Sequence, residues 1–251
     1  MSGPRTLVIV PTYNEIENLE TVVEKALEAL PEARVLVVDD NSPDGTGEKA
    51  DRMASREPRV QVLHRSSKRG LGSAYLEGFR WGMDHGFDLL VEIDADLSHD
   101  PSDLPRLIAA SAESDLVIGS RYVPGGRVLG WSSGRHLLSR AGNLFARVSL
   151  AIPIHDSTSG FRCFRFEVLK GIELESVTTD GYGFQIDMAY RAVVGGYEVV
   201  EIPITFVERG LGRSKMSGRI VVEALLKVAF WGVRDLFTLR RGRRRSRVGK
   251  N

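Results

Sequence analysis

Two carboxylates separated by one residue follow an apolar run in the middle of the chain. The run Leu89–Ile93 ends in Asp94-Ala95-Asp96, and Ser98 stands two positions later. Mg²⁺ and Mn²⁺ are held in proteins by one or two carboxylates together with water and substrate phosphate oxygens. The spacing therefore predicts a Mg²⁺ or Mn²⁺ site with Asp96 as direct ligand and Ser98 beside it, which leaves Asp94 for hydroxyl groups of a substrate. The alternative is that both acids merely cap the next helix.

Two other apolar runs also end in acidic loops. Pro11-Thr12-Tyr13-Asn14-Glu15 follows the first run, and Asp39-Asp40 opens a loop that extends to Gly45 after the second. A carboxylate in such a loop can accept hydrogen bonds from a nucleobase or a ribose. A plainer interpretation is also open, since Asp39 and Asp40 can start a turn and Glu15 can be an acid in the first turn of a helix.

The elements around these loops alternate in a regular way. Short runs rich in Val, Ile and Leu are separated by segments with helical periodicity, which predicts a doubly wound, mostly parallel α/β sheet with helices on both faces. Ligands of such sheets bind beyond the carboxyl ends of the strands, so the three acidic loops are expected to meet at one edge. The expected strands are 6–10, 35–38, 60–63, 89–93, 116–119 and 199–207, and the expected helices are 15–30, 44–55, 70–85 and one from about 102.

Common phosphate-binding and catalytic motifs are missing from the sequence. There is no Gly-x-x-x-x-Gly-Lys-Ser/Thr, no Gly-x-Gly-x-x-Gly opening a helix, no zinc-ligand spacing among the five His residues and no nucleophile elbow. P-loop, dinucleotide, zinc and acyl-transfer enzymes are therefore disfavoured. A site that binds phosphate groups would therefore need Arg or Lys side chains outside these motifs, although a single Arg or Lys is more often a solvated surface charge. The candidates are Arg121, Arg135, Arg209 and Lys215, the last in a Gly- and Ser-rich segment able to close over a diphosphate.

Two amphipathic segments lie in the second half, at about 128–152 and 219–239. In the second, four charged residues fall within any window of ~20 residues, the length needed to span a bilayer. The pattern favours helices that lie in a membrane interface or dock on an integral membrane partner, with Arg135 and Arg121 near the phosphate of a lipid. For the segment 219–239, a core helix followed by a disordered tail is the alternative.

Charge and cysteine content limit further which classes of protein and which cellular locations fit the sequence. The formal charge is +1, yet residues 240–251 hold seven of the 34 basic residues, so 27 basic and 33 acidic side chains remain in the body. An acidic body lacks the basic face of a nucleic-acid-binding fold. With the single Cys163 and no N-terminal signal, we expect a cytoplasmic protein, peripheral at the cytoplasmic face of a membrane. We expect one domain over 1–239 and a basic, disordered tail over 240–251.

Six motifs in register resemble the dolichyl- or polyprenol-phosphate mannose synthases. The match runs in order from about residue 6 to residue 218, so it covers most of the chain. Many members of that family continue into transmembrane helices, and this chain resembles the short form. The motifs are Val10–Glu15, Val38–Thr46, Arg69–Gly72, Asp94–His99, Gly119–Tyr122 and Thr158–Arg162.

The resemblance implies a GT-A fold and the transfer of mannose, with inversion, from GDP-mannose to a polyprenyl monophosphate. It implies that Asp94, Asp96 and Arg121 are catalytic, and that Asp96 and Ser98 hold the metal. Since a phosphate monoester is already ionised at neutral pH, no strong base is required, although Asp187 is a formal candidate. The residues implied to bind the nucleotide, the sugar diphosphate or phosphate are Pro11, Tyr13, Glu15, Val38, Asp40, Asp94, Ala95, Asp96, Arg121, Arg209 and Lys215.

Two other functions stay open at this point. Asp40 could accept a hydrogen bond from guanine or from uracil, so a polyprenyl-phosphate glucosyltransferase that uses UDP-glucose fits the same residues. A non-catalytic nucleotide-binding adaptor that recruits partners to a membrane also fits, because such an adaptor would use the same acidic loops and amphipathic segments as the enzyme.

Overall fold

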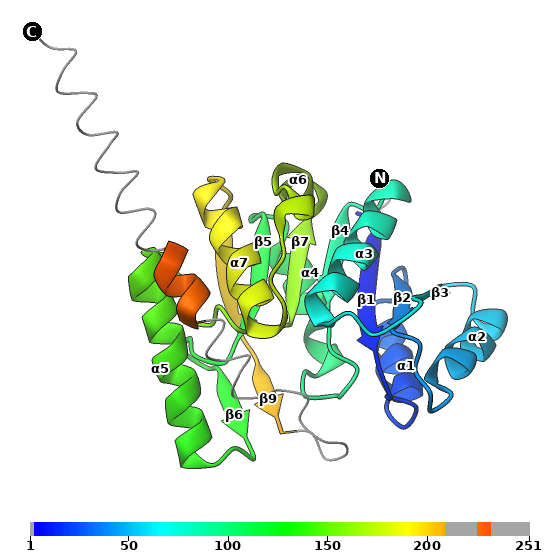
Figure 1. The fold of residues 1–251 in the computed structure, drawn as a ribbon. Coiled ribbons are helices and arrows are strands. Elements are labelled where there is room, and N and C mark those ends of the chain that lie inside the picture. Colours follow the sequence, from blue (N-terminus) through cyan, green and yellow to red (C-terminus); the bar gives the residue numbers. More distant parts are fainter. Residues whose placement is uncertain (1–2, 209–224, 232–251) are drawn as a thin grey trace, which may run out of the picture.

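Seven strands form the central sheet of the protein in the order β3-β2-β1-β4-β7-β5-β8 (Figure 1). The structure, a computed structural model, describes residues 3–208 and 225–231. β7 runs antiparallel to both of its neighbours, β4 and β5, and the other pairs are parallel. The strands are β1 Thr6–Thr12, β2 Arg34–Asp39, β3 Val60–His64, β4 Leu89–Glu92, β5 Leu116–Ser120, β7 Arg162–Arg165 and β8 Val199–Pro203.

Helices cover both faces of this sheet. The helices α1 (Leu19–Ala29), α2 (Thr46–Arg56) and α4 (Leu104–Ala110) pack on one face, with the short 3-10 turn η1 (Pro101–Asp103) before α4. The other face carries α3 (Leu71–Asp84), α5 (Ser133–Leu150), α6 (Phe166–Gly171) and α7 (Gly181–Val194). A second 3-10 turn, η2 (Leu174–Ser176), joins α6 to α7. The predicted doubly wound sheet is therefore confirmed.

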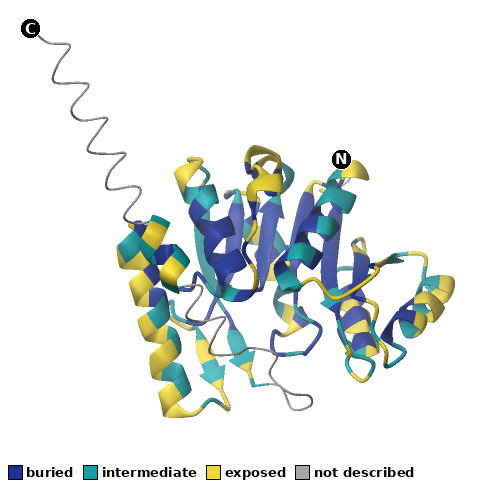
Figure 2. Cartoon of the chain, in the orientation of Figure 1, coloured by how far each residue is buried: buried dark blue, intermediate teal, exposed yellow. Residues whose placement is uncertain are grey.

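The alternation of apolar residues along each strand produces the two cores. In β1, Leu7 and Ile9 belong to the core under α3 and α7, whereas Val8 and Val10 belong to the core under α1 and α4. Successive side chains of a strand point to opposite faces, so a strand that is apolar at every position is buried on both sides. Figure 2 shows this directly, since the sheet is dark blue throughout its centre.

Several predicted boundaries were wrong. The single strand expected over 199–207 is broken at Ile204, and its end forms β9 (Thr205–Val207) beside β6 (Arg127–Leu129) in a separate two-stranded sheet. The segment expected to be amphipathic over 128–152 begins with β6, and its helix α5 starts only at Ser133. The first helix begins at Leu19, so Glu15 lies in the preceding loop and is not an acid of its first turn.

Only a part of the predicted helix 219–239 can be described. Residues 225–231 are helical, and the rest of that segment and the tail 240–251 lie outside the described residues. Among the helices that can be described, none combines the length and the apolar character needed to cross a membrane.

Candidate active site

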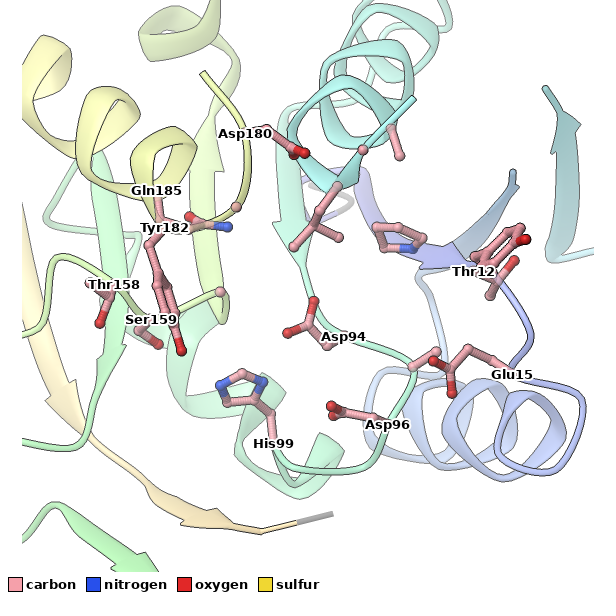
Figure 3. A pocket seen from close by; sticks show the side chains of 18 of the residues that line it. Thr12, Glu15, Asp94, Asp96, His99, Thr158, Ser159, Asp180, Tyr182 and Gln185 are labelled. Carbon is pink, nitrogen blue, oxygen red and sulfur yellow. The ribbon is translucent and has the colours of Figure 1, made fainter. Parts of the chain in front are cut away.

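The three acidic loops meet at one pocket of about 410 Å³, beyond the carboxyl ends of β1, β2, β4 and β5 (Figure 3). Pockets of this volume are typical of small-molecule sites. In Figure 3, Thr12 and Glu15 lie on one side, Thr158, Ser159, Tyr182 and Gln185 lie on the other, and Asp94 stands between them. Nine of the predicted site residues line this pocket, namely Pro11, Tyr13, Glu15, Asp40, Asp94, Ala95, Asp96, Arg121 and Arg135.

The two neighbouring acids after β2 have separate tasks. Asp39 accepts hydrogen bonds from the Thr12 hydroxyl at 2.9 Å and the Ser42 hydroxyl at 2.6 Å, so it ties the β1 and β2 loops together. Asp40 lines the pocket and is paired with the fully buried guanidinium of Arg65. Burial raises the pKa of Asp40, and Arg65 offsets part of that rise. The turn interpretation therefore fits Asp39, and Asp40 remains available to a ligand.

The Asp94–Ser98 loop turns sharply after β4. Leu97 has a φ of 59°, in the left-handed region that few residues other than Gly adopt, and the turn lets the Ser98 N–H donate to Asp96 Oδ1 at 3.0 Å. Backbone strain of this kind persists only where the surroundings hold it, and it clusters at functional sites. On the opposite side, the buried Tyr75 hydroxyl donates to Asp94 Oδ1 at 3.1 Å.

Arg121 has a buried partner that the sequence did not reveal. Its Nε donates to Asp156 Oδ2 at 2.7 Å and its Nη2 donates to Asp156 Oδ1 at 2.6 Å, and a further bond from Nη2 reaches the Thr158 hydroxyl at 2.8 Å. Burial raises the pKa of Asp156, but the attraction of Arg121 outweighs it and holds the pKa below its ordinary value. Arg121 therefore reaches the pocket as a fixed, already compensated charge.

Arg135 enters the same side of the pocket from α5. Its guanidinium stacks over the Trp131 ring at 4.2 Å and pairs with Glu208 at 2.5 Å. Both members of that pair are more than a third exposed. Because an exposed pair is weak and easily exchanged, Arg135 can turn to an incoming anion more readily than Arg121 can.

Four predicted site residues lie elsewhere. The side chain of Val38 is fully buried in the core and lies away from the pocket lining, and Ser98 lies just behind the lining with 3 % of its surface exposed. Arg209 and Lys215 lie outside the described residues. The formal base Asp187 also points away, since its carboxylate accepts from Arg191 at 2.7 Å and from Thr179 at 3.1 Å.

The glycines of the Arg69–Gly72 motif have a structural explanation. The N–H of Gly72, in the first turn of α3, donates to Asp180 Oδ1 at 2.7 Å. Gly70 has a φ of 97°, and a Cβ at this position would lie 2.1 Å from Asp180 Oδ2. The motif thus lets the acid before α7 cap α3 at the wall of the pocket, because Gly alone fits both the backbone and the space.

Three lining residues, Lys68, His99 and Gln185, were assigned no role from the sequence. Lys68 lies over the Tyr13 ring at 4.2 Å. His99 and Gln185 are almost completely buried, and among the described residues neither side chain has a hydrogen-bond partner. Burial lowers the pKa of His99 to about 4, so its ring is neutral at pH 7. Lys68 lies in a loop, His99 follows the acidic Asp94–Asp96 turn and Gln185 lies in a helix. Residues of these types are common at such positions, so the sequence does not mark them as part of a site.

The mostly parallel sheet with helices on both faces is shared with solved glycosyltransferases, and the predicted GT-A fold class is thereby confirmed. More particularly, the chain belongs to glycosyl transferase family 2, whose family profile matches residues 7–172.

Two known proteins are similar to this chain over most of its length, and a solved structure shares its fold. It is 53% identical over 229 residues to the undecaprenyl-phosphate mannosyltransferase of Micrococcus luteus, covering 91% of this chain and 94% of that one. It is 54% identical over 240 residues to the polyprenol monophosphomannose synthase of Mycolicibacterium smegmatis, covering 95% and 91%. A solved mannosyltransferase of Pyrobaculum calidifontis, in complex with GDP-Man and Mn²⁺, shares the fold with a TM-score of 0.57 at 19% identity, covering 92% of this chain and 70% of that one. The predicted resemblance is confirmed.

Proposed function

We propose that this chain transfers mannose from GDP-mannose to a polyprenyl monophosphate, with inversion at the anomeric carbon. Two relatives that align with more than 90% of the chain carry this sugar and a polyprenyl acceptor in their names. One observation on the molecule supports the proposal most strongly. The pocket has acids at its centre and nucleotide-type loops at one side, while two arginines and an apolar helix stand at the other.

The donor occupies the side formed by the β1 and β2 loops. The Tyr13 ring, the backbone near Pro11 and the carboxylates of Glu15 and Asp40 offer stacking and hydrogen-bond acceptors to a guanine and its ribose. Lys68, which lies over Tyr13, adds a positive charge where the diphosphate would approach. Val38 supports this loop from the core, since its side chain is buried.

The residues at the centre fit a hard divalent cation. Within residues 3–208 and 225–231, no cluster of three or more His, Cys, Asp or Glu side chains could hold a metal alone. Asp96 supplies a carboxylate at the lining and Ser98 an oxygen behind it, which suits Mg²⁺ or Mn²⁺ shared with a diphosphate. When bound, such an ion stabilises the negative charge that develops on the departing GDP.

The acceptor phosphate approaches from the side of Arg121 and Arg135. The Arg135 guanidinium reduces the repulsion between two anionic substrates, and Arg121, whose charge Asp156 compensates, lines the pocket as a fixed guanidinium for binding and orienting phosphate. A phosphate monoester is ionised at neutral pH, so orientation rather than proton removal limits its attack. The side chains therefore position two anions, and none has to act as a strong base.

A direct assay tests this proposal. We expect the protein with Mg²⁺ or Mn²⁺, labelled GDP-mannose and a polyprenyl monophosphate to produce a lipid-soluble label. Absence of that label, while the Micrococcus luteus relative is active in the same tubes, would refute the proposal. For an adaptor without catalysis, Asp96→Ala would leave cellular function intact, whereas we expect it to abolish that function.

An apolar face on α5 supports placement of the protein at a membrane surface. Leu137, Leu138, Leu144 and Val148 are each at least 59% exposed and fall on one side of the helix. Leu226 and Phe230, both 66% exposed, come from the helical residues 225–231, which lie beside α5 in Figure 1. Figure 2 shows this side as largely yellow. Patches of this kind mark interaction sites, and α5 also carries the exposed Arg140 and Arg147 for anionic headgroups.

We expect the triple variant Leu137→Ser, Leu144→Ser and Val148→Ser to lower the affinity for anionic phospholipid vesicles by about 100-fold, because each change removes apolar area from the interface. Flotation with protein-free vesicles measures this affinity. Val194→Ser, at a 66% exposed position on α7, is the matched control and should bind normally. Unchanged flotation of the triple variant would exclude α5 as the membrane face, and no flotation of the wild type would favour a protein partner.

A further inference from the structure

Gln185 is a buried amide whose hydrogen-bonding groups are left unused. It stands in α7 at the wall of the pocket, with 2 % of its surface exposed. In the described part of the chain, neither its Nε2 nor its Oε1 has a hydrogen-bond partner. A buried amide without partners is costly, and most such groups in proteins are paired with protein, water or ligand. The open side of this amide is the pocket, so a bound molecule is the natural partner.

The main chain at Gln185 is held by the surrounding structure. The fully buried guanidinium of Arg162 donates to the main-chain carbonyl oxygen of Gln185 at 2.6 Å. It also donates to the main-chain carbonyl oxygens of Ser159 and Ser157, both at 2.8 Å. The ring of Phe184 stacks on Tyr75 with centroids 6.1 Å apart. Arg162 therefore joins α7 to the Ser157–Gly160 loop and holds the main chain from which the Gln185 side chain extends to the pocket wall.

Gln185 and Asp94 face the same small space. A Cβ built on Gly160 would lie 3.4 Å from Asp94 Oδ2 and 3.5 Å from Gln185 Nε2, so both groups border the point that this glycine leaves open. Figure 3 shows Gln185 on the side away from Thr12 and Glu15, with Asp94 standing between the two sides. The space is thus separated from the nucleotide side and adjoins the carboxylate assigned to sugar hydroxyls.

The charge of the neighbours decides which part of the substrates fits there. Asp94 and Asp180 are the carboxylates on this part of the lining, whereas burial raises the pKa of the nearby Glu92 to about 8, with Arg162 and Gln185 offsetting part of that rise. The two carboxylates repel a phosphate group, whereas a neutral hydroxyl can both donate and accept. The arginines that suit a phosphate, Arg121 and Arg135, reach the pocket from other elements.

We infer that Gln185 binds a ring hydroxyl of the transferred sugar and is a specificity-determining residue of the enzyme. This inference rests on the proposed function, because it assigns the sugar part of the donor to this wall. The amide donates through Nε2 and accepts through Oε1, so it can read the orientation of a hydroxyl on the ring. A sugar epimer or a deoxy sugar would leave the buried amide unpaired, and sites built in this way discriminate strongly.

A cycle that combines enzyme variants with deoxy donors tests the inference. Gln185→Met keeps the length of the side chain and removes both polar groups, and we expect kcat/KM for GDP-mannose to fall about 100-fold while the Kd of GDP stays the same. The donors are GDP-mannose and its 2-, 3-, 4- and 6-deoxy analogues. We expect the wild type to lose about 100-fold with one analogue, and Gln185→Met to use that analogue as well as GDP-mannose.

Two further variants keep the result interpretable. Gln185→Asn retains the amide but withdraws it by one methylene, so it should lose the same discrimination even if Gln185→Met folds poorly. Met188→Leu, a fully buried change on the same helix, should discriminate like the wild type. Full discrimination by Gln185→Met or Gln185→Asn would overturn the inference, as would an effect confined to the KM of the polyprenyl phosphate. If the wild type instead uses a glucosyl donor, the proposed function fails, and the deoxy series of that sugar tests Gln185 equally.

Discussion

Asp96→Asn is expected to lower kcat/KM for sugar transfer by about 1000-fold, because the variant loses the negative charge that holds a divalent cation against the diphosphate. The change keeps the size of the side chain, and the amide oxygen can still accept the hydrogen bond from the Ser98 N–H, which is 3.0 Å from Asp96 Oδ1. We therefore expect the free energy of unfolding to change little. Initial rates over a range of GDP-mannose concentrations measure the effect.

A matched control lies four residues away. Asp100 is exposed and caps the η1 turn by accepting from the Ser102 N–H at 3.0 Å. Asn is an equally good cap, so Asp100→Asn should retain both activity and stability. A second readout separates binding from chemistry, since Mn²⁺ should tighten GDP binding to the wild type and leave GDP binding to Asp96→Asn unchanged. Equal Mn²⁺ dependence in both proteins would remove Asp96 from the metal site.

Asp156→Ala is expected to destabilise the protein by about 3–5 kcal/mol, because it leaves the buried guanidinium of Arg121 without its counter-charge. The side chain of Asp156 is fully buried and that of Arg121 is 4% exposed. Activity should fall as well, since Arg121 would no longer be held at the pocket. Urea denaturation at neutral pH measures the stability, and the exposed acid variant Glu113→Ala is the control that should behave like the wild type.

The same pair predicts a pH dependence with a definite sign. The pKa of Asp156 lies below its ordinary value in the folded protein, since the attraction of Arg121 outweighs burial. Its stabilisation is therefore complete above about pH 4, the ordinary pKa of Asp, and is lost on further acidification through the folded pKa. Asp156→Asn should remove this acid-dependent part of the stability. A stability curve for Asp156→Asn that falls as steeply with acid as the wild-type curve would contradict this assignment.

The central part of the site was predictable because it depends on sequence patterns within single strands and the loops that follow them. Each acidic loop follows an apolar strand, and parallel strands bring their carboxyl ends to one edge, so the meeting of Asp40, Asp94 and Asp96 follows from strand and helix periodicity. The partner of Arg121 was not predictable in this way. Asp156 is 35 residues further along, and the intervening chain includes β6 and the long helix α5.

The missed elements have similar causes. β7 is only four residues long and begins with the buried Arg162, so it looks like part of a polar loop. The break at Ile204 was hidden because the residues on both sides of it favour strands, although they join different sheets. Gln185 stands in a helix where a polar residue normally faces solvent, and only its packing against Arg162 and the pocket shows that it is buried.

A competition between donors tests the central proposal most directly. The wild-type protein, Mg²⁺ and a polyprenyl monophosphate would be incubated with equal amounts of two donors. One is GDP-mannose labelled with ¹³C in the sugar, and the other is unlabelled UDP-glucose. Mass spectrometry would then measure the mass of the lipid product. We expect a polyprenyl phosphohexose that carries the ¹³C label. A product with the unlabelled hexose would instead identify a glucosyltransferase, and the absence of any lipid-linked hexose would contradict the proposed transfer altogether.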